Sequence, residues 1–215
     1  EQFNRPYYKQ VEEVAPVDIE FGALGYADAA NVSYKIFRQL KSEGVVPENI
    51  RFQVCLPTPA AVIGGFIDPD QQAAIEPAYE RAMIDEVSRI VASIPNDELS
   101  IQWDIAHEPI SAEGGGPGLY YDDMYGGTVD RVCRLSDAVP NPVELGLHLC
   151  YGDPGHKHVI EPADLNVCVR LSNGFATETK RSIQWVHMPV PRDRDDHAYF
   201  APLENLKLAR DTELI

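Results

Sequence analysis

One stretch of the chain carries an imidazole and a thiol two residues apart. Leu145, Leu147 and Leu149 alternate with a second set of positions that includes His148 and Cys150. This period of two is typical of a β-strand, and it turns the imidazole and the thiol toward the same side. A Gly-Asp-Pro-Gly sequence follows at 152–155 and ends the strand. The two side chains are therefore expected at the carboxyl end of a strand, where α/β proteins place their chemistry.

A nitrogen and sulfur pair of this kind suits a borderline-soft metal such as Zn²⁺. Two simpler interpretations stand beside metal binding. A single cysteine on a strand is usually a small buried apolar residue, and a single histidine is usually a hydrogen-bonded residue at a rim. The choice depends on what the rest of the chain places around His148 and Cys150.

The composition excludes some partners. The chain has 215 residues, and 34 acidic against 18 basic residues give it a net charge of −16. Such a chain repels phosphate backbones and anionic lipids, so we expect neither nucleic acid nor a membrane surface as a partner. We find no apolar run long enough to span a membrane and no signal-peptide pattern at the N-terminus. The spacing of the four cysteines suggests no disulfide framework, which favours reduced thiols and a cytoplasmic location: Cys55, Cys133, Cys150 and Cys168.

Strand and helix patterns alternate along the chain. Five segments are predicted as strands, and a sixth begins at the C-terminus: 17–21, 51–56, 99–105, 144–151, 183–188 and 212–215. Helical spacing of apolar residues predicts the intervening helices: 27–43, 77–94, 128–138 and a segment opened by 161–164 and reaching Phe175. For 166–171 a strand is the alternative, and 203–210 is either helix or loop.

Repeated strand–helix units without tight hairpins predict a parallel sheet covered by helices. Gln102 and Asp104 share one face of the strand 99–105, opposite its apolar face. A polar inner face and an apolar outer face favour a closed (β/α)8 TIM barrel over an open sheet. We therefore expect residues 1–215 to form a single α/β barrel domain that is incomplete at both ends, lacking the first strand and the last part of the barrel.

Several motifs resemble one family. The His-x-Cys-Tyr motif at 148–151 resembles the zinc motif in the C-terminal catalytic barrel of cobalamin-independent methionine synthase. The segment Ile101–Asp104 resembles that family's strand with a substrate-binding aspartate. Further segments resemble the shorter, single-barrel methionine-synthase-like proteins, which belong to the superfamily shared with uroporphyrinogen decarboxylase: Phe21–Tyr26, Phe52–Pro59 and Trp185–Pro191.

The resemblance implies a zinc-dependent methyltransferase that moves a methyl group, typically from a folate, to a thiol acceptor whose pKa the metal lowers. His148 and Cys150 match two ligands of the family's zinc. The family's glutamate ligand has no counterpart on 183–188, where His187 either replaces it or orients a loop or substrate. The family's last cysteine ligand would lie beyond Ile215.

Asp104 corresponds to the aspartate that holds the amino group of the thiol substrate, and we assign it and His187 as catalytic residues. Tyr26, His107 and Glu108 are further candidates for substrate binding. The family's second glutamate for the substrate amine has no counterpart at 23–26.

Two other functions stay open. A degenerate barrel could serve as a non-catalytic binding or scaffold subunit, which the missing glutamate favours. A metal-free decarboxylase or lyase, as in the superfamily's other branch, would hold substrate carboxylates with arginines, and the inward faces show none. For the methyltransferase we expect Zn²⁺ as the cofactor and small-molecule substrates as partners, and a homo-oligomer is left open.

Overall fold

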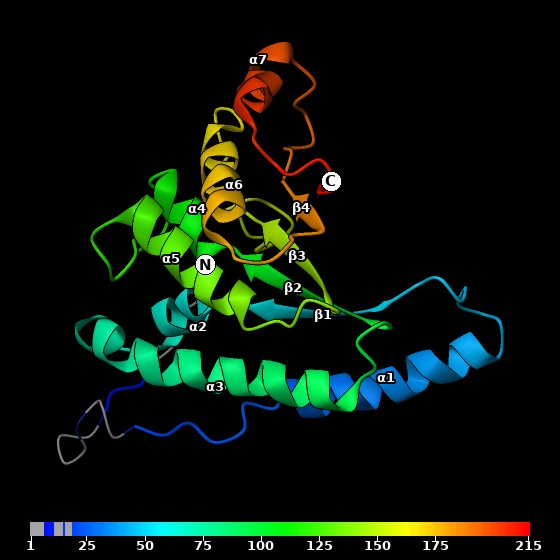
Figure 1. The fold of residues 1–215 in the computed structure, drawn as a ribbon. Helices are drawn as coiled ribbons and strands as arrows, with labels where there is room; N and C mark the ends of the chain where they lie inside the picture. Colours follow the sequence, from blue (N-terminus) through cyan, green and yellow to red (C-terminus); the bar gives the residue numbers. More distant parts are fainter. Residues whose placement is uncertain (1–6, 11–14, 16–18) are drawn as a thin grey trace.

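The computed structural model describes residues 7–10, 15 and 19–215. It is an α/β structure built on a five-stranded, all-parallel sheet with the order β1-β2-β3-β4-β5 (Figure 1). The strands are β1 (Phe52–Pro57), β2 (Leu99–Ile105), β3 (Glu144–Leu149), β4 (Trp185–His187) and β5 (Glu213–Leu214).

Helical segments connect the strands. The α-helices are α1 (Tyr26–Ser42), α2 (Pro59–Phe66), α3 (Gln72–Ser93), α4 (His107–Ala112), α5 (Met124–Asp137), α6 (Asn166–Glu178) and α7 (His197–Phe200). Among the described residues, the connections also contain the 3₁₀ turns η2 (Pro69–Gln71) and η3 (Ala201–Asn205).

Each strand from β2 to β5 pairs with the strand that precedes it in the chain. This sequential parallel order confirms the predicted alternation of strands and helices, and no hairpin joins two strands in the part of the chain that the structure describes. The long helix α3 runs beneath the sheet beside α1, while α5 and α6 stand next to each other (Figure 1). The parallel α/β architecture is thus confirmed, and the closed barrel stays a prediction.

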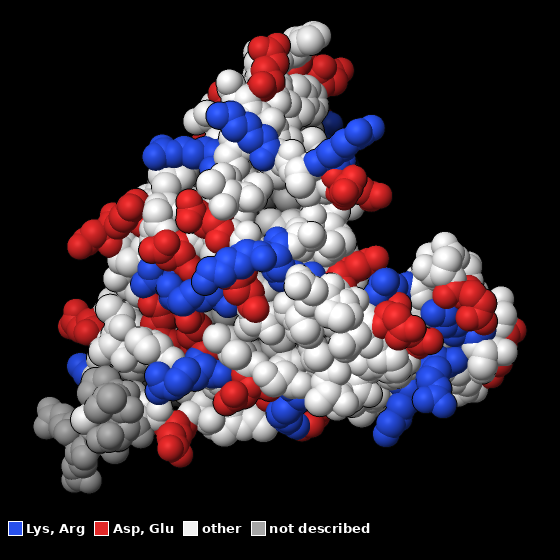
Figure 2. Space-filling view, viewed as in Figure 1, with Lys and Arg blue, Asp and Glu red and all other residues white. Residues whose placement is uncertain are grey.

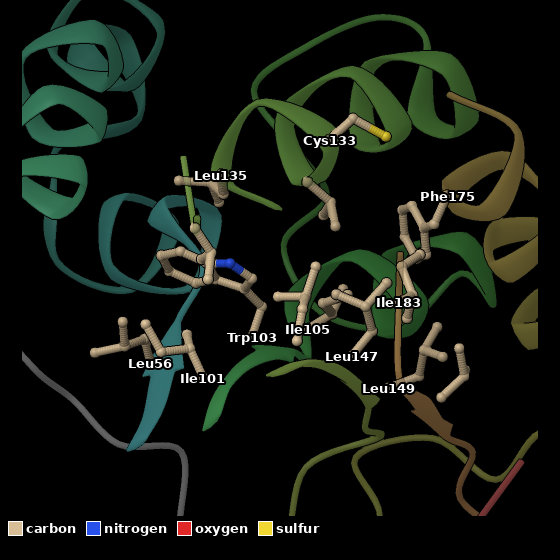
Figure 3. Close-up of a cluster of buried hydrophobic side chains, with 14 of the residues drawn as sticks. Leu56, Ile101, Trp103, Ile105, Cys133, Leu135, Leu147, Leu149, Phe175 and Ile183 are labelled. Atoms are coloured by element: carbon tan, nitrogen blue, oxygen red, sulfur yellow. The ribbon is translucent and has the colours of Figure 1, made fainter. Parts of the chain in front are cut away.

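The hydrophobic core lies between the sheet and these helices. Leu99, Ile101, Trp103 and Ile105 alternate along β2, and none of them is exposed to solvent. Figure 3 shows Trp103 within a cluster of side chains from the strands and from α5 and α6. Full burial of each such side chain contributes about 1.5–3 kcal/mol. The apolar face predicted for 99–105 is therefore the face that packs on helices.

Of the six predicted strands, one fails in its described part and four differ in their bounds. The predicted strand 144–151 ends at Leu149, and 212–215 shortens to Glu213–Leu214. The predicted bounds of 99–105 are confirmed, and 51–56 is displaced by one residue, but 183–188 shortens to Trp185–His187. Of the predicted strand 17–21, positions 17 and 18 lie outside the described residues. Residues 19–21 are not in a strand, so this part of the prediction is wrong. Ile19 and Phe21 instead pack on the core as irregular chain, and a ring contact joins Phe21 to Tyr79.

The helices depart from the prediction at Pro77 and in three short helices that were not predicted: α2, α4 and α7. Helix α3 begins at Gln72, and Pro77 lies inside it. Proline in a helix is most frequent in the first turn, so the pattern predicted that the helix begins near Pro77 and placed its start too late. Helices α2 and α4, which follow β1 and β2, were not predicted. Helix α2 is apolar almost throughout and so lacks the periodic pattern of an amphipathic helix. For 166–171 the helix is confirmed as the start of α6.

Charged side chains of both signs are interspersed over the face drawn in Figure 2. The net charge of the chain is −16, and on the drawn face acidic side chains interrupt the basic ones.

Candidate functional site

Three predicted site residues form one row across the sheet. Asp104 on β2 is in register with His148 on β3, which is in register with His187 on β4. The three are at or next to the carboxyl ends of their strands. Because side chains alternate along a strand, this row lies on the face opposite the helix-packed core. The sheet therefore brings together a carboxylate and two imidazoles that are far apart in the sequence.

The two imidazoles of this row are in direct contact. The ring centroids of His148 and His187 are 4.5 Å apart, and the ring planes are inclined by 36°. Nδ1 of His148 is buried and has no hydrogen-bond partner among the described residues. Burial lowers the pKa of His148, the His187 ring lowers it further, and Asp104 opposes both effects. The lowered pKa favours the neutral imidazole, which keeps one ring nitrogen as an acceptor.

Cys150 follows directly after β3, at the start of the turn that ends the strand. Its backbone N–H donates to the carbonyl of Ile105 at 2.9 Å, and its Sγ accepts from the N–H of Gly152 at 3.2 Å. Gly152 has a φ of +76°, a conformation that side chains other than glycine rarely adopt. Burial raises the pKa of the Cys150 thiol. The thiol is therefore protonated at neutral pH unless a cation binds to it.

A second row, Gln102–Gly146–Trp185, lies next to the first row along the same three strands. Nε1 of Trp185 donates to Oε1 of Gln102 at 3.1 Å. Nε2 of Gln102 in turn donates to Oδ1 of Asp104 at 2.8 Å. A hollow of about 480 Å³ opens beside this row. Its lining includes Ser100, Gln102, Glu144, Trp185, His187 and Glu213.

The other three predicted substrate-binding residues lie elsewhere. Tyr26 begins α1 and lines a separate hollow along β1. His107 is the first residue of α4 and packs against Gly64 of α2. The Glu108 side chain is only 2% exposed and interacts electrostatically with Glu76 and Arg131, which belong to α3 and α5. None of the three is in the row formed by the residues from β2, β3 and β4.

The donor set suits zinc in its chemistry but is incomplete in its arrangement. A neutral imidazole and a thiol are the ligands that Zn²⁺ prefers, and His148 Nδ1 is buried without a partner. Within the described part of the chain, however, no group of three or more His, Cys, Asp or Glu side chains is placed to hold a metal ion. Zn²⁺ in proteins normally takes at least three protein ligands. His148 and Cys150 supply two, and His187 would have to turn to supply the next.

The sequence reasoning assigned no role to Trp185, Gly146 or Gln102 in the site. A Cβ atom on Gly146 would lie 1.8 Å from Cε2 of Trp185, so only glycine leaves room for the indole there. The alternation of β3 already placed Gly146 on the same face as His148. This alternation was the only signal in the sequence that could have pointed to Gly146. The pattern of a single strand does not show which side chain of a neighbouring strand lies over a glycine.

The described residues thus form a parallel α/β fold with two imidazoles, a thiol and a carboxylate at the carboxyl edge of its sheet. The chain matches no family model, no curated protein and no solved structure. Among the residues that the structure describes, we find no helix with the length and apolar character needed to cross a membrane.

Proposed function

We propose that this chain is a zinc-dependent methyltransferase domain, in which His148 and Cys150 are zinc ligands and the methyl acceptor is a thiol. One observation is the main support for the proposal. Asp104, His148 and His187 share one row at the carboxyl edge of the sheet, with Cys150 just beyond it. The resemblance of the motifs 101–104 and 148–151 to methionine synthase supports the same function.

Bound zinc would lower the pKa of a substrate thiol and so make the thiolate available near neutral pH. The chain's own residues would hold and orient the reactants. The neutral His148 imidazole can coordinate without first losing a proton, and Asp104 offers a carboxylate to a cationic group of the acceptor. His187, in contact with the His148 ring, would turn to become the third protein ligand. A folate-type compound is the methyl donor proposed.

The fold proposed for this function is a (β/α)8 barrel. The sequential parallel order of the strands supports it, since each strand–helix unit adds to the sheet in the same direction. The polar composition of the face that carries Asp104 and His148 supports it as well. Parallel sheets are almost always covered on both faces, and barrel closure would cover this one.

The metal content of the full chain tests the proposal. We expect purified protein to bind about one zinc per chain, as structural and catalytic zinc sites do. Cys150→Ser and His148→Ala should each weaken zinc affinity by at least about tenfold, measured by competition with a chromophoric chelator. Cys55→Ser is the matched control, because Cys55 is an exposed thiol on β1, which β2 separates from β3 in the sheet. Undiminished affinity in Cys150→Ser would exclude the site.

A non-catalytic binding subunit is the second candidate. The observation that favours it is the lack of a third metal donor in place among the described residues. If the full chain binds no zinc and transfers no methyl group from methyltetrahydrofolate to homocysteine, this second candidate replaces the first. The metal-free lyase has less support. Arg51, which borders the same hollow, is paired with Glu144 at 3.0 Å and is not available to a substrate carboxylate.

A further inference from the structure

The indole of Trp185 lies over Gly146 and forms part of the wall of the hollow of about 480 Å³. A Cβ atom on Gly146 would lie 1.8 Å from Cε2, 2.1 Å from Cζ2 and 2.2 Å from Nε1 of the indole. Because Cε2 is the nearest of these three bonded atoms, Gly146 faces the flat side of the ring and not its edge. Nε1 donates to Oε1 of Gln102 at 3.1 Å, which fixes the orientation of the ring. One face of the indole therefore covers the sheet, and the opposite face is open to the hollow.

Polar groups without partners lie in the same lining. Ser100 is 4% exposed and lines the hollow, and its hydroxyl makes no hydrogen bond to another described residue. Glu213, which is in register with Trp185, also lines the hollow and forms no ion pair with another described residue. Buried polar side chains normally have a hydrogen-bond partner. The lining thus favours a ligand that donates hydrogen bonds.

The charges of the lining favour a cation. Glu144 and Glu213 contribute two carboxylates, and Arg51 is the one Lys or Arg among the described residues that line the hollow. Nε of Arg51 lies 3.0 Å from Oε1 of Glu144, and its Nη1 donates to the carbonyl of Asn96 at 3.0 Å. The carboxylate of Glu213 is left without a counter-charge. A cation over the face of a tryptophan ring is also attracted by the ring itself.

We propose that this hollow binds a small molecule with a guanidinium group, which stacks on the open face of Trp185 and donates hydrogen bonds to Glu213 and Ser100. A guanidinium is planar, charged and weakly hydrated, and it stacks on aromatic rings while its N–H groups pair with carboxylates. A primary ammonium is compact and strongly hydrated, so it suits the carboxylate but not the flat ring.

The size and place of the hollow agree with such a ligand. Sites for small molecules measure about 300–1,000 Å³, and this hollow measures about 480 Å³. The proposed zinc ligands His148 and Cys150 are not among the residues that line it. The guanidinium site is therefore a second site on the sheet, and it does not depend on the proposed function.

Three probes of similar size separate the contributions of charge and shape. Butylguanidinium has both the charge and the plane, butylurea has the plane alone, and butylammonium has the charge alone. The ¹⁵N-labelled full chain has two indole N–H signals, from Trp103 and Trp185, which Trp185→Phe assigns. Butylguanidinium should move the Trp185 signal and not that of Trp103, which is buried in the core. It should bind at least about tenfold more tightly than either other probe, the effect of one charge-assisted hydrogen bond or one stacked cation.

Variants remove one contribution at a time. Glu213→Gln should weaken butylguanidinium about tenfold and leave butylurea within about twofold, because only the charged probe uses the carboxylate. Trp185→Leu should weaken butylguanidinium about tenfold, measured by calorimetry, and Trp185→Phe should weaken it less because a ring face remains. Glu204→Gln, at an exposed position on η3 outside the hollow, is the matched control and should change no affinity. The Trp103 signal shows in each variant that the chain is folded.

Three results would overturn the proposal. Equal affinities of the wild type for butylguanidinium and butylurea would mean that the carboxylates contribute nothing. Equal affinities for butylguanidinium and butylammonium would mean that the indole does not select a planar group. A Trp185 signal that no probe moves would mean that the hollow is not a binding site. The zinc affinity of the chain is measured separately by chelator competition, so each of these results leaves the proposed function standing.

Discussion

The guanidinium of Arg131 on α5 makes two hydrogen bonds to the carboxylate of Glu76 on α3. Nε lies 2.6 Å from Oε1, and Nη2 lies 2.8 Å from Oε2. Glu76 is 4% exposed, and the guanidinium stacks over the ring of Tyr121 at 3.8 Å. An ion pair with two hydrogen bonds, buried on its glutamate side, therefore joins two helices that cover the core.

Removal of one member of this pair should be costly. Arg131→Leu leaves the Glu76 carboxylate buried without its partner, and we expect a loss of about 3–5 kcal/mol in the free energy of unfolding. Arg134→Leu is the matched control, since Arg134 bonds Glu80 between the same two helices but is half exposed. Arg134→Leu should lower the free energy of unfolding by at most about 1 kcal/mol. Urea unfolding of both variants measures the difference, and equal losses would contradict the prediction.

Glu108 should make stability depend on pH. Complete burial raises the pKa of its carboxyl from an ordinary 4.5 to about 7. Between these two values the folded state keeps a proton that the unfolded state has released. The stabilisation is therefore fully present below pH 4.5 and is lost as the pH rises through 7, with a total of the order of 3 kcal/mol.

Glu108→Gln removes this titration. The difference in the free energy of unfolding, wild type minus variant, should decrease from pH 5 to pH 8. Denaturant titrations of both proteins at each pH measure this difference. Glu76, Arg131 and Tyr121 surround the carboxyl electrostatically and are unchanged in both proteins. A difference that stays constant across this range would show that Glu108 does not titrate there.

Gly146→Ala should displace the Trp185 indole. The added methyl group would lie 1.8 Å from Cε2 of Trp185, so the ring must move and its bond to Gln102 must break. Overpacking of this kind costs about 1–3 kcal/mol. Trp185 and Trp103 are the two tryptophans of the chain, so emission in a Trp103→Phe background reports the move directly. Gly65→Ala, where a Cβ meets nothing within 4 Å, should leave both stability and emission nearly unchanged.

His187→Ala should weaken zinc binding by about tenfold or more while the protein stays folded. The His187 ring contacts the ring of His148, so His187 is either a further zinc ligand or the residue that orients the His148 ligand. His156→Ala is the control, because the side chain of His156 is 97% exposed in the loop beyond β3. Competition with a chelator measures both affinities. Equal affinities in the two variants would remove His187 from the site.

The sequence by itself determined the parallel α/β architecture. Alternation over 99–105 predicted that β2 would bury Trp103 and its apolar neighbours and turn Gln102 and Asp104 to the other face. Helical spacing likewise predicted α1 to within one residue, with Gly44 at its end at a φ of +73°. These features follow from local periodicity, which each segment carries within itself.

Only the tertiary structure decided which residues of the site meet. No local pattern sets the register between strands, and that register places Asp104, His148 and His187 in one row while it leaves Glu108 buried among helices. The indole of Trp185 reaches Gln102 because Gly146 lies between them in a neighbouring strand. Pairing between strands depends on how distant segments pack together, so the alternation within each strand could give the face of a side chain but not its partner.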